Sequence, residues 1–417
     1  MRMVGEDSMI KLLMLLEIFI TIVTNYYFIL SIFGIVRASK SKKYSRPTTK
    51  FAAIVAAHNE EKVIADIIES LKSVDYPSEL LDIYVVADNC DDKTANISRK
   101  MGANVFERKD TSIKGKGYAL KWMFDRINNL DKHYDALAIF DADNLVSSNF
   151  FLEMDKRYRK GAKVIQGYVD SKNPNDTWIT GSYSISFWAA NRLFQLARQN
   201  INLSCQLNGT GFCVDTELLN DVGWEADSLT EDLEFSCKLV LEGYRVDWCY
   251  DAVVYDEKPL KLVDSLRQRK RWMQGFSDVF SKYFFKLIKK SIVEFDFSAF
   301  DCAMYVFQPF IVLIYAAVTI LSIMLPINAG IASTVNQNFI TITIRVLGLL
   351  QFLYIPIILI MDKKINFRIM VCYLMLYQFF MLTWVPITVA GIIDKNKKSW
   401  EKTAHTRSIS INEMKAS

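Results

Sequence analysis

The chain has 417 residues, of which 51% are hydrophobic and 13% aromatic, and its formal net charge at pH 7 is only +4. This length predicts two or three domains. The small positive excess does not indicate a nucleic-acid partner, because the basic clusters flank apolar segments and therefore favour a membrane as the partner.

The first apolar segment runs from Met9 to Val36 and contains only two charged residues, Lys11 and Glu17. The sequence RASKSKKYSR follows at once, with five basic residues and no acid. A membrane span needs about 20 apolar residues, and basic residues collect on the cytoplasmic side. Residues 1–50 therefore predict a transmembrane helix with a basic juxtamembrane segment, and the chain after Arg37 is expected in the cytosol.

Residues 51–275 have the pattern of an α/β domain. FAAIVAA, DIYVVAD and ALAIFDAD are short apolar runs that predict buried strands, and KVIADIIESLKSV has helical periodicity. Strands that alternate with helices favour a mostly parallel sheet. The polar clusters HNEE, DNCDD and DADN each follow one of these strands. Ligands bind beyond the carboxyl ends of strands in open α/β sheets, so the three clusters predict one site.

Two aspartates in FDADN, Asp141 and Asp143, are spaced so that both side chains point the same way at the end of a strand. Adjacent carboxylates repel each other unless a cation or hydrogen-bond donors neutralise them. Mg²⁺ or Mn²⁺ shared with substrate phosphates would do so. In TSIKGKGYALKW, Lys114 and Lys116 stand among glycines that let the backbone approach an anion, although the segment is not a P-loop.

LTEDLEFS places Glu231, Asp232 and Glu234 directly after Thr230. Such acids are typical of the first turn of a helix, with Thr230 as its N-cap. Seven cysteines lie scattered without a C-x-x-C pair, and the chain has only three histidines. A zinc site is therefore not expected, and the thiols suit packing in a reducing cytosol.

The C-terminal region contains three more apolar candidates for spans, Cys302–Leu325, Ile340–Met361 and Ile369–Ile393. Residues 276–301 are mixed basic and aromatic, which is typical of interfacial amphipathic helices. Residues 302–394 are thus expected to be C-terminal transmembrane helices and 395–417 a tail. Four spans would place the lysine-rich tail outside, against the preference of lysine for the cytoplasm, so one candidate is open to a re-entrant or interfacial placement.

Seven motifs occur in an order that resembles the processive family 2 glycosyltransferases, the group of the cellulose, chitin and hyaluronan synthases. They are VAAHNEE, VVADNCDDKT, GKGYAL, FDADN, NGTGFCV, LTEDLEFS and QRKRWMQG, which cover most of residues 51–275. The first motif departs from the family pattern, because Ala56 replaces the usual proline.

The resemblance implies an α/β domain of GT-A type inserted between transmembrane helices, a UDP-sugar donor and inversion to a β-linkage. Glu60, Asp88 and Lys116 match nucleotide-binding positions, and Asp141 and Asp143 match the metal and diphosphate motif. Asp232 matches the general base, with Glu231 beside it. The acceptor side is expected to include the floor Gly209, Thr210 and Gly211 and the helix residues Gln268, Arg269, Arg271 and Trp272.

The function expected from this resemblance is a multi-pass membrane synthase with a cytoplasmic catalytic domain. It would polymerise a β-glycan from UDP-glucose with Mg²⁺ or Mn²⁺ and no organic cofactor, and pass the growing polysaccharide across the lipid bilayer. Three alternatives stay open: a polymer synthase for UDP-N-acetylglucosamine, a single-sugar transferase to a lipid acceptor, and a transport subunit that only binds nucleotide. A regulatory cyclic-dinucleotide domain is not expected.

Overall fold

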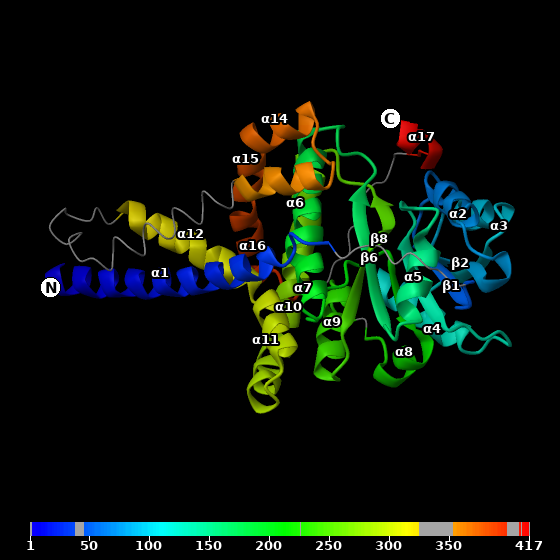
Figure 1. Cartoon of the computed structure of the whole chain (residues 1–417), viewed down its shortest axis with the longest axis horizontal. Coiled ribbons are helices and arrows are strands. Elements are labelled where there is room, and N and C mark those ends of the chain that lie inside the picture. The colour runs from blue at the N-terminus through cyan, green and yellow to red at the C-terminus, as the bar shows by residue number, and fades with distance from the viewer. Residues whose placement is uncertain are drawn as a thin grey trace.

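A computed structural model describes residues 2–37, 46–225, 227–324, 353–397, 408–409 and 411–416. An eight-stranded sheet with helices on both faces forms one end of the molecule, and helices α1 and α12 extend away from it (Figure 1). The predicted site residues belong to the part of the molecule that contains the sheet. Helices α1 and α12 form a separate, extended part.

The sheet has the strand order β3-β2-β1-β4-β7-β6-β8-β5. Strands β1, β2, β3 and β4 pair in parallel, whereas β7 is antiparallel to both of its neighbours, β4 and β6. The prediction of a mostly parallel sheet is confirmed for this half of the domain. The strands are β1 Phe51–Ala57, β2 Leu81–Asp88, β3 Asn104–Arg108, β4 Ala136–Asp141, β5 Leu145–Val146, β6 Val164–Ser171, β7 Phe212–Asp215 and β8 Val246–Asp256.

Strand β1 shows why its sequence is apolar throughout. Ala52 and Ile54 belong to the core on one face of the sheet, and Ala53 and Val55 belong to the core on the other. Side chains alternate between the two faces, so a strand covered on both sides has no polar positions. The covering helices are α2 Ile64–Lys72, α3 Thr94–Lys100, α4 Lys116–Ile127, α5 Phe150–Tyr158, α6 Trp178–Ala190, α8 Thr216–Val222 and α9 Glu231–Leu241; a π-helical turn Asn191–Leu196 and α7 Ala197–Asn200 continue α6.

The domain boundary expected at residue 275 falls inside a single helix, α10, Leu262–Val293. This helix carries both the QRKRWMQG motif and most of the segment that was expected to be separate interfacial helices. It packs against α9 and against α11, Phe297–Val306. Residues from the expected catalytic domain and from the expected interfacial segment therefore share one helix.

One described helix is long and apolar enough to cross a membrane, the Lys11–Ile32 part of α1 (Arg2–Ile32). Two bent pairs reach that length only when each is counted as one span. They are α11 with α12 (Gln308–Met324), bent by 58°, and α14 (Phe367–Met375) with α15 (Tyr377–Leu382) and α16 (Trp384–Ile393), bent by 51°. Most of the predicted span Ile340–Met361 lies outside the described residues. A last helix, α17, spans Ile411–Ala416.

Candidate active site

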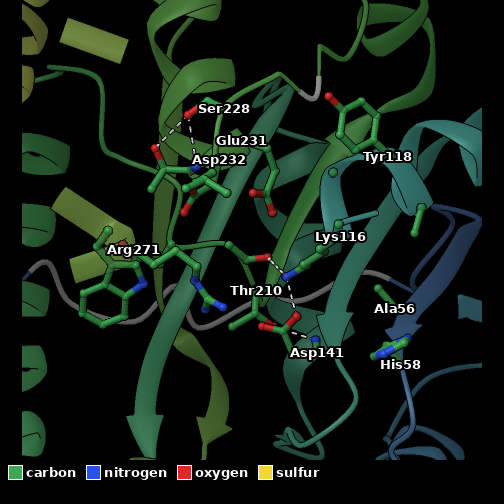
Figure 2. A pocket seen from close by; sticks show the side chains of 18 of the residues that line it. Ala56, His58, Lys116, Tyr118, Asp141, Thr210, Ser228, Glu231, Asp232 and Arg271 are labelled. Carbon is green, nitrogen blue, oxygen red and sulfur yellow. Dashed lines mark hydrogen bonds and ion pairs between the residues drawn. The ribbon is translucent and has the colours of Figure 1, made fainter. Parts of the chain in front are cut away.

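A cavity of about 910 Å³ lies at the carboxyl ends of β1, β2 and β4. All three polar clusters predicted to meet there contribute to its wall, which confirms the expected juxtaposition. Helices α4, α9 and α10 supply further wall residues, among them Lys116, Asp232 and Arg271 (Figure 2). From the predicted set the wall includes Glu60, Asp88, Lys116, Asp141, Asp143, Gly209, Thr210, Glu231, Asp232, Gln268, Arg271 and Trp272.

The end of the cavity beside β1 and β2 is built around Asp88. Arg108 donates from Nη1 to Asp88 Oδ1 at 2.7 Å, and both side chains are buried. Burial raises the pKa of Asp88, and the ion pair with Arg108 only partly offsets this effect. His58 Nδ1 lies 2.6 Å from the backbone oxygen of Asp88. The ion pair fixes the Asp88 carboxylate at the cavity edge, where it can accept hydrogen bonds from a bound ring or ribose.

Lys116 is the first residue of α4 and lies at the centre of the cavity (Figure 2). The preceding residue, Gly115, has φ +133°, a conformation that side-chain-bearing residues rarely adopt, and this turn aims Lys116 inward. Its Nζ donates to the backbone oxygen of Gly209 at 2.7 Å and pairs with Asp141. Burial alone would lower the pKa of Lys116, but the carboxylates of Asp141 and Glu231 outweigh it and raise that pKa. Lys116 is therefore a permanent cation placed to meet an anionic ligand.

Asp141 ends β4, and Asp143 lies in the turn that follows, so the expectation that a strand aligns the two side chains was wrong. The turn is held by Asn144 and Thr210, since Asp141 N donates to both side-chain oxygens at 3.1 Å. Both aspartates still line the cavity. The described residues contain no group of three or more His, Cys, Asp or Glu side chains suited to a metal ion. Two carboxylates fit Mg²⁺ or Mn²⁺ only with phosphate and water oxygens as the further ligands.

Asp232 lies in the first turn of α9, with Thr230 at the N-cap position as predicted. Thr230 makes no side-chain cap bond, however, and its Oγ1 instead lies 3.2 Å from Ser228 Oγ. Burial and the neighbouring Glu231 raise the pKa of Asp232 to about 7. Glu234 has a different role, because it accepts from Ser228 N and pairs with Lys282 of α10. The helix start is thus held by Glu234, which leaves Glu231 and Asp232 facing the cavity.

Helix α10 presents Gln268, Arg271 and Trp272 to the cavity, because these residues recur on one helix face. Trp272 packs against Tyr183, with ring centres 6.1 Å apart, and stacks on Trp384 of α16. The neighbouring rings therefore hold an apolar surface of Trp272 at the cavity wall.

Two predicted site residues do not line the cavity. Arg269 is fully buried on another face of α10, where it donates to Thr383 Oγ1 at 2.8 Å and lies 4.1 Å from the Phe380 ring centre. One residue along a helix turns the side chain by about 100°, which separates Arg269 from Gln268. Gly211 packs under the floor, where an added Cβ would lie 2.3 Å from Val254.

One residue that lines the cavity, Asp256, was not predicted from the sequence. Asp256 ends strand β8, so the rule that polar residues at strand ends gather at the site would have found it. Arg108 ends β3 and does not line the cavity itself, but it holds Asp88 at the cavity edge. Tyr305 reaches the cavity from α11, and its apolar surroundings in the sequence gave no signal. Asp256 lines the cavity and pairs with Lys258 at 2.7 Å.

Known proteins resemble this chain over most of its length. A probable glycosyltransferase, YdaM, of Bacillus subtilis is 24% identical over 87% of this chain and 89% of its own. A poly-beta-1,6-N-acetyl-D-glucosamine synthase of Staphylococcus epidermidis is 23% identical over 71% of each chain. A beta-monoglucosyldiacylglycerol synthase of Trichormus variabilis is 26% identical over 57% of this chain and 51% of its own.

A mannosyltransferase from Pyrobaculum calidifontis, solved with GDP-Man and Mn²⁺, has the same fold at a TM-score of 0.60 and 17% identity. The alignment covers 94% of this chain and all of that one. The α/β domain is thus GT-A-like, with a curled, mostly parallel sheet. The model of the "Glycosyltransferase like family 2" matches residues 47–275, more than half of the chain, and this chain therefore belongs to that glycosyltransferase family.

Proposed function

We propose that this glycosyltransferase is an inverting, membrane-bound synthase that extends a β-linked glycan from a UDP-hexose. The observation that carries the proposal is the order of groups along one cavity. His58, whose ring contacts the backbone of Asp88, lies on one side, Lys116 and Asp141 lie in the middle, and Asp232 and Arg271 lie on the other side (Figure 2). A nucleotide, its diphosphate, the transferred sugar and the acceptor need such groups in this order.

Asp232 acts as the base of the reaction. It accepts the proton of an acceptor hydroxyl as that oxygen attacks the anomeric carbon, and the bond from this carbon to the diphosphate oxygen breaks on the opposite side. The products are a β-glycosidic bond, a protonated Asp232 and UDP. A base within hydrogen-bond reach accelerates such a step by roughly 10²- to 10⁴-fold.

Lys116 and Arg271 bind the negative charge of the diphosphate, and Asp141 and Asp143 would hold Mg²⁺ or Mn²⁺ beside it. The metal, when bound, stabilises the charge that develops on the leaving group. Full activity in an excess of chelator would show that Asp141 and Asp143 do not hold a metal ion that the reaction needs.

We consider two donors, UDP-glucose and UDP-N-acetylglucosamine. The G-T-G of the floor, Gly209–Gly211, favours UDP-glucose by its resemblance to β-glucan synthases. The similarity to the poly-beta-1,6-N-acetyl-D-glucosamine synthase favours the amino sugar. Assays should therefore offer both donors.

A second candidate is transfer of a single sugar to a lipid acceptor. Its support is the apolar end of the cavity, where Phe187, Trp272, Phe276 and Tyr305 lie, together with the similarity to the beta-monoglucosyldiacylglycerol synthase. Radiolabelled UDP-sugar with the purified full-length protein separates the two functions. A polymer retained by a sizing column supports synthesis of a glycan, whereas a label that partitions with lipid supports the second candidate.

The first prediction concerns Trp272, which offers a flat ring to the growing end. Trp272→Ala should abolish long product and leave donor hydrolysis or short oligosaccharides, because the growing end loses the ring on which its terminal sugar stacks. The nearest measured analogue, stacking of a nucleobase on an aromatic side chain, contributes roughly 1–3 kcal/mol per contact. Product length is measured for this variant, for Trp272→Phe, and for Trp122→Ala as a control whose ring packs on Arg126 away from the cavity. Unchanged product length from Trp272→Ala would contradict the stacking role.

A further inference from the structure

The segment α14–α16 is apolar enough to count as a broken span, yet it contacts the catalytic domain at its beginning. Asn366 Nδ2 donates to Asn175 Oδ1 at 3.1 Å. Cys372 Sγ lies 3.4 Å from the backbone oxygen of Trp178, the first residue of α6. Helix α14 is therefore fixed to the start of α6.

The middle and the end of the segment are fixed to the same domain. The centres of the Phe380 and Tyr183 rings lie 5.2 Å apart. Gly391 packs closely on α10, because a Cβ added to Gly391 would lie 2.4 Å from the Cβ of Met273. Asp394, which follows α16, pairs with Lys270 at 2.5 Å. Contacts with α6 and α10, which both carry cavity residues, thus continue from residue 366 to residue 394.

This arrangement argues against a membrane crossing by the bent segment α14–α16. A span extends over about 30 Å of hydrocarbon and about 20 residues. Helices α1 and α12 do run side by side away from the sheet, whereas α14–α16 lie across that direction beside α6 and α10 (Figure 1). A segment held along its whole length on the catalytic domain cannot also leave that domain to cross the bilayer.

The face of α14–α16 turned away from the domain is strongly apolar. Met375, Leu382 and Ile393 are 65%, 67% and 75% exposed, and Phe367 is 83% exposed. Lysines flank the segment on both sides, at positions 363 and 364 and at 395 and 397. An apolar face with basic flanks is the composition of a helix that lies in the membrane interface.

We propose that α14–α16 lies flat on the bilayer surface that faces the catalytic domain, and that it seats this domain on the membrane without crossing. The occupant of the apolar face is then the lipid of the same bilayer that α1 enters. The tail gives independent support, because Ile409 N donates to Asp66 Oδ2 of α2 at 3.2 Å. The described residues Asp394 and Ile409 therefore both lie against the catalytic domain.

The proposal removes the conflict in the sequence-based topology. Because α10 and α14 both contact the catalytic domain, an even number of crossings separates them. The segment α11–α12 would be one of these crossings. The lysine-rich tail is then on the cytoplasmic side with the RASKSKKYSR segment. None of this depends on the identity of the sugar or the acceptor.

Depth-dependent fluorescence quenching tests the placement. Met375→Cys, Leu382→Cys and Ile393→Cys of the full-length protein are labelled with NBD and reconstituted into vesicles that carry nitroxide lipids, spin-labelled either shallow or deep. Ile22→Cys in α1, where Ile22 is 64% exposed, is the matched control, and the wild-type chain gives the background from its native cysteines. An interfacial helix lies about 5–10 Å into the headgroup boundary.

The shallow nitroxide should quench all three α14–α16 positions more than the deep one, and the deep nitroxide should quench position 22 more. Stronger deep quenching at position 382, the middle of the apolar segment, would mean that it spans the bilayer. If neither nitroxide quenches any of the three positions, protein and not lipid covers the apolar face of α14–α16. If one variant does not fold, Phe379→Cys, at a side chain 63% exposed, replaces it.

The side of the tail is tested by an impermeant thiol reagent on sealed vesicles of one orientation. Lys397→Cys reports the end of α16, and Lys132→Cys reports the catalytic domain. Both should be labelled from the same side. Labelling from opposite sides would overturn the proposal even if the depth profile agreed with it.

Discussion

Asp232 is a half-buried carboxylate beside a second acid, and this environment suits a base. Burial and Glu231 raise the pKa of Asp232 to about 7, while Lys116 opposes the shift. A base is most effective when its pKa lies near the working pH. The largest cause of the raised pKa of Asp232 is burial, which the sequence alone does not reveal.

Asp232→Asn should lower turnover by roughly 10²- to 10⁴-fold, because the acceptor hydroxyl loses its base. UDP affinity should change little, since Asp232 lies on α9, away from the strand ends around Asp88. Turnover and equilibrium UDP binding are measured together. Glu242→Gln, at an exposed acid that caps the same helix, is the control. A comparable loss of UDP binding would show that Asp232 contacts the donor.

The raised pKa of Asp232 also predicts a pH-dependent stability difference. The folded protein holds the proton of Asp232 up to a pH of about 7, whereas the unfolded chain releases it near 3.8. Ionisation therefore costs folding free energy fully above pH 7, and the cost disappears as the pH falls towards 4. Asp232→Asn should melt at a higher temperature than the wild type at pH 8 and equally near pH 4. A difference that does not vary with pH would contradict the shift.

At the scale of elements, the contact of α9 with α10 sets the position of Asp232, the proposed base. An added Cβ on Gly275 would lie 2.4 Å from Thr230 Oγ1 and 2.9 Å from Thr230 Cβ. Thr230 is the N-cap residue of α9, two residues before Asp232. Gly275 thus permits the approach that brings Trp272 and Asp232 to the same cavity.

Gly275→Ala should lower both the melting temperature and the turnover, although alanine favours helix by about 1 kcal/mol over glycine. The steric overlap with Thr230 forces α10 away from α9. The double variant Gly275→Ala with Thr230→Gly removes the overlapping atoms and should recover melting temperature relative to the sum of the single variants. Additive effects of the two changes would show that the contact is not the cause.

At the scale of the molecule, one buried network joins the α/β domain to helices α1 and α11. Arg198 of α7 donates to both carboxylate oxygens of Asp301 in α11, at 2.6 and 2.8 Å. Tyr26 of α1 donates to the same carboxylate at 2.6 Å. Three segments far apart in the sequence therefore meet at Asp301, which is 1% exposed.

Asp301→Asn should destabilise the protein by about 3–5 kcal/mol, because Arg198 is left as a buried charge without its partner. The melting temperature of the detergent-solubilised protein measures the effect. Lys238→Gln, which breaks the ion pair with the half-exposed Glu225, is the control and should cost less than about 1 kcal/mol. Equal effects of the two variants would mean that the network does not hold the domain to the helices.

The sequence alone determined the features that depend on local pattern. The runs that became β1, β2 and β4 are apolar because both sheet faces are covered, and the polar residues after them meet because parallel strands end at one edge. The family motifs added Lys116 and Asp232, and the cavity contains both.

Only the tertiary structure decided which surface covers each apolar or basic side chain. Arg269 and Arg271 are two residues apart in one motif, yet one is buried under α15 and α16 and the other lines the cavity. The apolar α14–α16 likewise lies on α6 and α10, although its composition equally suits a span. An apolar composition predicts that a side chain will be buried away from water. Whether lipid, another helix or a ligand covers that side chain depends on contacts between distant parts of the chain.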